Sequence, residues 1–326
     1  MDWQPGAVVR GRDGQEFVVV DFINRGSFGN VYRVRRLEDG LEFALKTINT
    51  RDLDVVGLRA LLNEGRLALE IDDPNVIRVY HFHDGGGRSN PGQPRSSDRH
   101  RGPGPFVIMD LADGGSLQDV IESRRPLGAQ FRTDNLTVMF RQLASGMKAI
   151  NAKLIHRDIR PGNILIHRGR LKIADFGLAK AVGTRPSVDS ARESLHVKYR
   201  APEAWGAGVD TVAMDMYSMG IVFYEMATLR HPYTPDERTD PVSAWRSAHV
   251  YAGVEPADKL NRQLPRTVAR LVAKMMAKRP QDRPSWDDLL LRLELPTGVE
   301  AQGAGVRPEP GDLGLWGPIP LPLIVG

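Results

Sequence analysis

Residues 154–177, LIHRDIRPGNILIHRGRLKIADFG, bring three polar side chains, Asp158, Asn163 and Asp175, into one short span. Two triplets on either side of Arg168-Gly169 predict a tight hairpin of two short strands: Ile164-Leu165-Ile166 and Leu171-Lys172-Ile173. Such a hairpin would leave Asp158 and Asn163 on a loop and place Asp175 just past a strand end. Phosphoryl transfer needs groups of this kind, because a carboxylate orients the attacking hydroxyl while oxygen ligands hold Mg²⁺ on the nucleotide phosphates.

The sequence His156-Arg157-Asp158, Asn163 five residues after that aspartate, and Asp175-Phe176-Gly177 resemble motifs of the eukaryotic-type (Hanks-type) protein kinase family. Ala201-Pro202-Glu203 resembles the end of that family's activation segment. The resemblance covers about residues 17–295. It implies an α+β, protein-kinase-like bilobal fold, in which a small antiparallel β-sheet lobe carries one helix and a larger lobe is mostly helical.

Composition along the chain predicts the domain boundaries. A stretch rich in Gly, Pro, Ser and Arg, with almost no apolar residue, predicts a disordered insertion between two strands. The expected parts are an N-terminal segment (1–15), a kinase domain (16–295) with an N-lobe (16–110), the insertion (about 84–105) and a C-lobe (113–295), and a Pro/Gly-rich flexible tail (296–326).

Two predicted strands, residues 16–23 and 29–36, flank a glycine-containing turn. Gly26 and Gly29 would let backbone N–H groups approach phosphate oxygens. An ordinary glycine-containing hairpin explains this stretch equally well when it is taken alone. The kinase pattern has three glycines, and Asn24 stands at the first. Because Asn tolerates left-handed backbone conformations, we expect the turn to be kept.

Lys46 ends an apolar strand-like run, and a buried Lys is uncommon unless it is paired. The resemblance implies that the partners of Lys46 are the α/β-phosphates of ATP and Glu64. Glu70 is the alternative to Glu64. Without the resemblance, either Glu is explained as an ordinary solvated side chain. The resemblance also implies that backbone groups of residues 110–112 recognise adenine. The residues expected around ATP are Ile23, Asn24, Gly26, Ser27, Phe28, Gly29, Val31, Ala44, Lys46, Glu64, Met109, Asp110, Ala112, Leu165 and Asp175.

The resemblance implies a role for each catalytic residue. Asp158 would orient the acceptor hydroxyl, Lys46 the phosphates, and Arg160 would bring positive charge to the transferring phosphoryl group. Asn163 and Asp175 would bind Mg²⁺. ATP and Mg²⁺ are therefore the expected cofactors, and a protein is the expected substrate.

Two positions leave open whether the phosphate acceptor is Ser/Thr or Tyr. Arg160 stands where Ser/Thr kinases usually have Lys, and His196 where they usually have Thr; both resemble tyrosine-kinase patterns. Pro161-Gly162-Asn163 and the motif that begins at Asp215 resemble bacterial Ser/Thr kinases, so we favour transfer to Ser/Thr. A tyrosine or dual-specificity kinase and a nucleotide-binding pseudokinase scaffold remain alternatives. A small-molecule kinase is disfavoured by the Ala-Pro-Glu segment and by Arg283.

The resemblance also implies contacts outside the catalytic motifs. Glu203 would pair with Arg283, and Asp215 would anchor the backbone of the catalytic loop. Arg157 would pair with a phosphate on the activation segment. The hydroxyl-bearing residues of that segment are Thr184, Ser187, Ser190 and Ser194, of which the last two are the nearest candidates.

The composition argues against several other classes. The chain has 326 residues, 41% of them hydrophobic, a formal net charge of +4 and no cysteine. The absence of cysteine excludes disulfides and thiol catalysis, and dispersed Lys and Arg argue against nucleic-acid binding. No apolar run approaches the roughly 20 residues that span a bilayer, and the N-terminus does not resemble a signal peptide. We expect a cytoplasmic protein without a membrane span; self-association for trans-autophosphorylation stays open.

Overall fold

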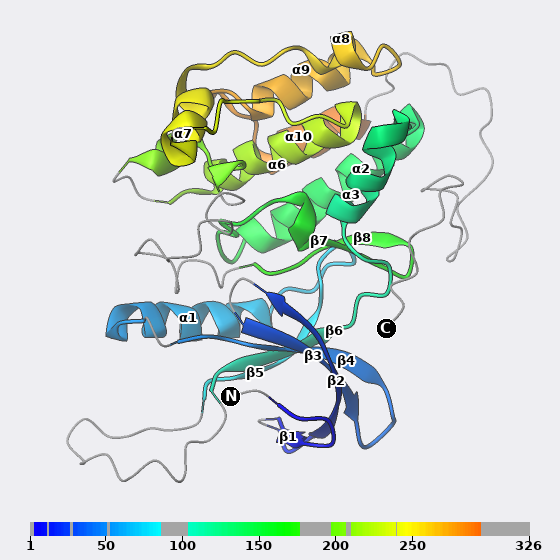
Figure 1. The fold of residues 1–326 in the computed structure, drawn as a ribbon, viewed down its shortest axis with the longest axis vertical. Coiled ribbons are helices and arrows are strands. Elements are labelled where there is room, and N and C mark those ends of the chain that lie inside the picture. Colours follow the sequence, from blue (N-terminus) through cyan, green and yellow to red (C-terminus); the bar gives the residue numbers. More distant parts are fainter. Residues whose placement is uncertain are drawn as a thin grey trace. The chain divides into compact units, whose positions relative to one another are not determined.

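The computed structural model describes residues 3–11, 13–26, 29–50, 53–85, 104–176, 197–206, 210–238 and 240–294. These residues form two compact units (Figure 1). The sheet unit contains the described residues up to 72 and within 77–111, and the helical unit contains residues 73–76 and the described residues from 112 onward. Ser27, Phe28, most of the predicted insertion, the activation-segment hydroxyls, His196 and the predicted tail lie outside the described residues.

The sheet unit is built on one antiparallel sheet of six strands in the order β1-β2-β3-β4-β6-β5. Its strands are β1 (Val8–Arg10), β2 (Glu16–Gly26), β3 (Gly29–Arg36), β4 (Glu42–Thr47), β5 (Val79–His83) and β6 (Phe106–Asp110). The predicted bounds of β3 are confirmed, and β2 runs three residues beyond its prediction. β1, which lies in the expected N-terminal segment, was not predicted.

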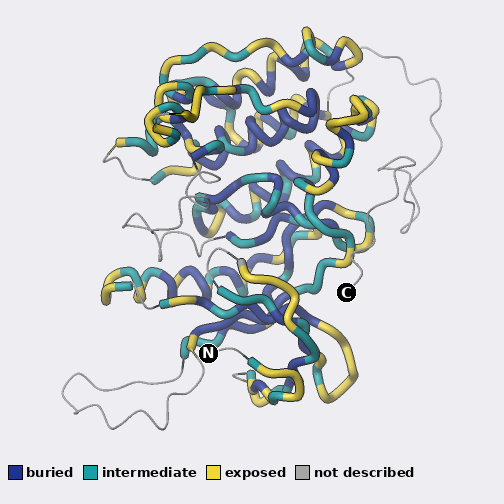
Figure 2. The backbone as a smooth tube through the Cα atoms, in the orientation of Figure 1, coloured by how far each residue is buried: buried dark blue, intermediate teal, exposed yellow. Residues whose placement is uncertain are grey.

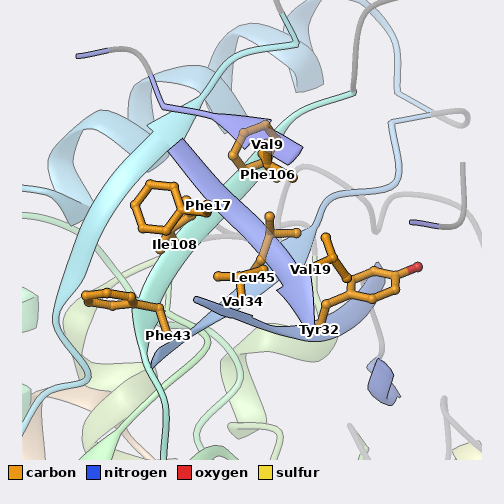
Figure 3. Close-up of a cluster of buried hydrophobic side chains, with 9 residues drawn as sticks. All are labelled: Val9, Phe17, Val19, Tyr32, Val34, Phe43, Leu45, Phe106 and Ile108. Atoms are coloured by element: carbon orange, nitrogen blue, oxygen red, sulfur yellow. The ribbon is translucent and has the colours of Figure 1, made fainter. Parts of the chain in front are cut away.

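One face of the sheet forms a hydrophobic core (Figure 3). Successive residues of a strand point to opposite faces. Because Phe43 and Leu45 of β4 enter this core, Ala44 and Lys46 lie on the other face. The same alternation places Val31 of β3 on that other face. The core residues are Val9, Phe17, Val19, Tyr32, Val34, Phe43, Leu45, Phe106 and Ile108.

The single described helix of the sheet unit, α1 (Val55–Ala68), packs against β5. Asp54 caps its N-terminus by accepting a hydrogen bond from the Gly57 N–H at 2.7 Å. Gly65 lies so close to the Phe82 ring that a Cβ at this position would overlap it. The close approach of α1 to the sheet therefore depends on glycine at residue 65.

The turn after β2 differs from its expected form. Asn24 lies in β2 opposite Val31, just after a register shift, and it does not have a positive φ. The tolerance of Asn for left-handed backbone is therefore not what accommodates it; a β-bulge does. Gly29 is also required by the sheet, because a Cβ there would overlap the carbonyl oxygen of Thr47.

The helical unit is built around two long helices, α3 (Thr133–Asn151) and α6 (Val212–Thr228). One apolar face of α3 is buried, and its Phe140 ring stacks on Phe223 of α6 with 3.9 Å between ring centroids. α6 is buried along nearly all of its length (Figure 2). The other α-helices among the described residues of this unit are α2 (Leu117–Arg124), α7 (Pro241–Tyr251), α8 (Ala257–Leu260), α9 (Arg266–Met275) and α10 (Trp286–Glu294).

The predicted hairpin is present as β7 (Ile164–His167) and β8 (Arg170–Ile173). Capping boxes begin two helices, because Ser116 and Asp119 bond reciprocally at the start of α2, as do Ser285 and Asp288 at α10. β5 begins at Val79, and Val76 forms an isolated bridge with Ile173 of β8. Within the described ranges, no helix is long and apolar enough to cross a membrane.

Candidate active site

The loop before β7 is anchored by a buried carboxylate of α6. Asp215, 1% exposed, accepts the backbone N–H groups of His156 at 2.7 Å and Arg157 at 2.9 Å. It also accepts the side-chain amide of Asn151 at 2.7 Å. The predicted role of Asp215 as an anchor of this loop is confirmed.

His156 joins the same loop to the residue before Asp175. Its ring is fully buried, and Nδ1 accepts the Asp158 N–H at 3.3 Å. The ring proton must then lie on Nε2, which donates to the Ala174 carbonyl at 3.0 Å. The Ala174 N–H in turn donates to the Asn163 carbonyl at 2.8 Å. These bonds hold Asp158, Asn163 and Asp175 in one continuous framework.

Asp158 is 5% exposed, and within this framework its carboxylate contacts the side chains of Asn163 and Arg160. The Asn163 amide nitrogen donates to its Oδ2 at 2.7 Å and to its backbone carbonyl at 2.8 Å. Arg160 Nε lies 3.4 Å from its Oδ1. Because the Asn163 nitrogen faces Asp158, the remaining polar atom of that amide is its carbonyl oxygen.

Arg157 and Asp175 both have left-handed backbone, with φ of 67° and 63°. Left-handed φ is uncommon outside glycine, and it persists where neighbouring contacts enforce it. Arg157 is held by the bond from its N–H to Asp215, and Asp175 follows Ala174, whose N–H and carbonyl are both bonded. The motif sequence alone does not predict these two left-handed conformations.

The donor chemistry at Asn163 and Asp175 suits a hard cation. A carboxylate and an amide oxygen are ligands that Mg²⁺ accepts, with water and nucleotide phosphates completing the shell. Among the described residues there is no cluster of three or more His, Asp or Glu that could hold a metal by itself.

In the sheet unit, Lys46 and Glu64 are both nearly buried, at 1% and 8% exposure. Lys46 lies opposite Val31 in the β3–β4 register, and Ala44 opposite Met109 of β6. Glu70, the alternative to Glu64, is exposed and lies beyond the end of α1. Burial of a carboxylate on α1 favours Glu64.

The other residues expected around ATP lie in both units. Ile23 is in the bulge region of β2 and is 45% exposed, and Asn24 is also exposed. Asp110 uses its side chain to accept the Arg78 N–H at 3.2 Å and the Tyr80 hydroxyl at 2.9 Å. Ala112 follows β6 and is half-buried, as is Leu165 of β7.

The predicted ion pair of the Ala-Pro-Glu motif is confirmed. Arg283, buried, donates to both oxygens of Glu203 at 2.5 and 2.8 Å, and also to the Ala213 carbonyl at 2.8 Å. Bidentate pairing of this kind fixes the geometry as well as the charge.

The backbone carbonyls of residues 198–199 accept hydrogen bonds from side chains on α6 and just after it, which the sequence did not indicate. The Ser218 hydroxyl donates to the Tyr199 carbonyl at 2.7 Å, and His231 Nε2 donates to the Lys198 carbonyl at 2.9 Å. Burial lowers the pKa of His231 to about 4, so the ring is neutral at physiological pH. The Tyr199 hydroxyl donates to the buried Glu225 at 2.5 Å.

Glu225 makes stability depend on pH. Burial raises its pKa from 4.5 to about 7, and the Tyr199 hydroxyl and Arg125 only partly oppose that rise. A raised pKa gives stability that is fully present below pH 4.5 and is lost as the pH rises through 7. A shift of this size corresponds to about 3 kcal/mol of unfolding free energy. We expect Glu225→Gln to remove this decline, because Gln still accepts from Tyr199 and carries no charge.

Urea unfolding of wild type and Glu225→Gln at pH 5 and pH 8 measures this effect. Glu294→Gln, whose side chain is 56% exposed, is the control and should follow the wild type. An equal loss of stability between the two pH values in wild type and Glu225→Gln would contradict the assignment.

Arg157 also has a carboxylate partner that the sequence did not indicate. Its Nε donates to Asp210 Oδ2 at 2.9 Å, and the two side chains are 18% and 28% exposed. The expectation for Arg157 was a phosphate on the activation segment, whose hydroxyls lie outside the described residues.

Comparisons with known proteins place this geometry in a family. The protein kinase domain family matches residues 17–292. The chain is 27% identical over 281 residues to serine/threonine-protein kinase Nek5 of Homo sapiens, covering 85% of this chain and 36% of that one. It is 30% identical over 243 residues to PknA of Corynebacterium glutamicum, covering 70% of this chain and 47% of that one. It is 28% identical over 259 residues to PrkC of Bacillus subtilis, covering 77% and 36%.

The chain spans less than half the length of each of these three relatives. The solved kinase domain of PknI from Mycobacterium tuberculosis has a similar fold, with a TM-score of 0.63 and 18% identity, covering 90% of this chain and 98% of that one. This likeness confirms the expected α+β, protein-kinase-like bilobal fold. Membership of the family implies the use of ATP and of a divalent metal. The match over most of its length shows that the chain belongs to the protein kinase family.

Proposed function

We propose that this chain is an ATP-dependent protein kinase that transfers the γ-phosphate of ATP to Ser or Thr hydroxyls of proteins. The observation that carries the proposal is the Asp158 carboxylate, held between the Asn163 amide and Arg160 on a loop anchored by Asp215. A carboxylate fixed in this way can accept the proton of an attacking hydroxyl without reorganising.

The remaining residues have proposed roles in the same reaction. Lys46 binds the α/β-phosphates and is oriented by Glu64. Asn163 and Asp175 bind Mg²⁺, which neutralises charge on the β- and γ-phosphates. Arg160, beside Asp158, stabilises negative charge on the transferring phosphoryl group. The family resemblance implies Ile23, Val31, Ala44, Met109 and Leu165 as adenine contacts, with backbone groups of Asp110 and Ala112 at the adenine edge. It implies Asn24, Gly26, Ser27, Phe28 and Gly29 as phosphate contacts.

Ser/Thr transfer is supported by the printed names of the relatives, which describe serine/threonine kinases. The Arg160–Asp158 contact supports catalysis over a pseudokinase, because the residue that departs from the Ser/Thr pattern still brings its cation to the catalytic carboxylate. The proposed kinase domain extends over residues 16–295, with the tail at 296–326.

The test is phosphate transfer from γ-labelled ATP to myelin basic protein and to the chain itself. The reactions contain Mg²⁺, Mn²⁺ or EDTA, and phosphoamino-acid analysis follows. Phosphoserine or phosphothreonine with Mg²⁺, abolished by EDTA and by Asp175→Asn, is the expected result. Phosphotyrosine would instead support the alternative indicated by Arg160 and His196. ATP binding without transfer under any condition would identify a pseudokinase.

A further inference from the structure

Arg157 lies immediately before Asp158, so the backbone conformation of Arg157 sets the position of Asp158. Its backbone is left-handed, its N–H donates to Asp215, and its side chain is only 18% exposed. A guanidinium withdrawn this far from water needs an anionic partner, since an uncompensated charge would be costly there. The position of the loop therefore depends on what neutralises Arg157.

Asp210 supplies a negative charge at this place. Its Oδ2 accepts from Arg157 Nε at 2.9 Å in a charge-assisted hydrogen bond. Asp210 lies two residues before α6, the helix that carries Asp215. The short stretch 210–215 thus holds both the side chain and the backbone of Arg157.

We propose that Asp210 is a built-in counter-ion that positions the Asp158 loop for catalysis without phosphorylation of the activation segment. The inference rests on the proposed kinase function and concerns the regulation of the same site. Asp210 is a positioning residue, because it acts on Asp158 only through Arg157.

The charges predict how phosphorylation would act. A phosphate carries about −1.5 to −2 charges at neutral pH, and Asp210 already neutralises the single charge of Arg157. A phosphate approaching that guanidinium would therefore meet repulsion from Asp210, so phosphorylation should change wild-type activity little. In Asp210→Asn the repulsion and the counter-ion are both gone, so the phosphate should activate.

The first arm of the test removes the phosphate acceptors by replacing Thr184, Ser187, Ser190 and Ser194 with Ala. The full chain carrying these four substitutions should keep its kcat within about threefold of wild type. Adding Asp210→Asn should lower kcat by about tenfold, within the usual range of coupling between sites, with the KM for ATP little changed. Asp210→Glu in the same background should restore most of the activity. Asp236→Asn, which removes an exposed partner of Arg238, is the matched control and should have no effect.

The second arm uses Asp210→Asn with its hydroxyls intact, treated with phosphatase or phosphorylated by wild-type enzyme. Recovery of kcat in the phosphorylated form is expected, and a merely structural loss would not be recovered in this way. If the four-alanine variant is inactive while its thermal unfolding midpoint is unchanged and the wild type is active, this inference is overturned. The proposed function is not affected by that result. An undiminished kcat in phosphatase-treated Asp210→Asn would likewise overturn this inference alone. Failure of wild type to transfer phosphate in any form would overturn the proposed function and this inference with it.

Discussion

Replacement of Asp158 by Asn is expected to lower kcat by about three orders of magnitude, while ATP affinity stays within a few-fold of wild type. The amide of Asn can still accept the hydrogen bond that Asn163 now donates to the carboxylate at 2.7 Å. It cannot accept a proton from the attacking hydroxyl, and general-base catalysis of this kind contributes about 10²- to 10⁴-fold. Steady-state kinetics with a peptide acceptor, together with ATP titration, measures the two quantities separately.

The control for this substitution is Asp134→Asn on α3, where the side chain is 84% exposed. It should leave both kcat and KM unchanged. A kcat for Asp158→Asn within tenfold of wild type, at unchanged KM, would show that the proton leaves by another route. A rise in KM with constant kcat would make Asp158 a binding group.

The local elements could be predicted from the sequence because their signals are local. The residues that follow the glycine-containing turn located β3, and Ser-x-x-Asp spacing marks the starts of α2 and α10. The motif that begins at Asp215 also identified the anchoring role of that residue, because the family resemblance implies it. β1 escaped prediction because three residues are too few to show a period.

Contacts between distant residues could not be predicted from spacing. Arg157 and Asp210 are 53 residues apart, and Tyr199 and Glu225 are 26 apart; both pairs depend on how loops return to α6. Nothing in the sequence around Glu225 indicates that its carboxylate is buried. The order of the sheet, in which β6 inserts between β4 and β5, likewise depends on pairing between non-consecutive strands.

The departure from the glycine pattern at Asn24 also needed the structure. When only sequences are compared, the missing first glycine suggests that nucleotide binding is lost. In the sheet, Asn24 follows a bulge and needs no positive φ, whereas Gly29 faces a carbonyl that leaves no room for a Cβ. Gly29 is therefore required by the sheet itself, whereas Asn24 is compatible with its own backbone conformation, so the absence of glycine at residue 24 does not by itself disrupt β2.

Asp215→Ala is expected to have the second large effect, on stability and activity together. The substitution leaves the N–H groups of His156 and Arg157 and the amide of Asn151 without their acceptor at a site that is 1% exposed. Each unsatisfied buried donor costs about 1–3 kcal/mol, so the free energy of unfolding should fall by about 4 kcal/mol. The same two N–H groups hold the loop that carries Asp158, so the folded variant should also lose about 100-fold in kcat, a loss typical of displaced catalytic groups.

Urea unfolding followed by tryptophan fluorescence measures the first effect, and kinetics at a temperature where the variant remains folded measures the second. Asp287→Ala provides the comparison, since its ion pair with Lys148 is exposed and should be worth less than about 1 kcal/mol. Asp215→Asn should lie between Ala and wild type, because it keeps one acceptor oxygen. If Asp215→Ala lost stability but kept wild-type kcat when folded, the anchor would support the fold alone, and the position of the Asp158 loop would have to be maintained by His156 and Asn163.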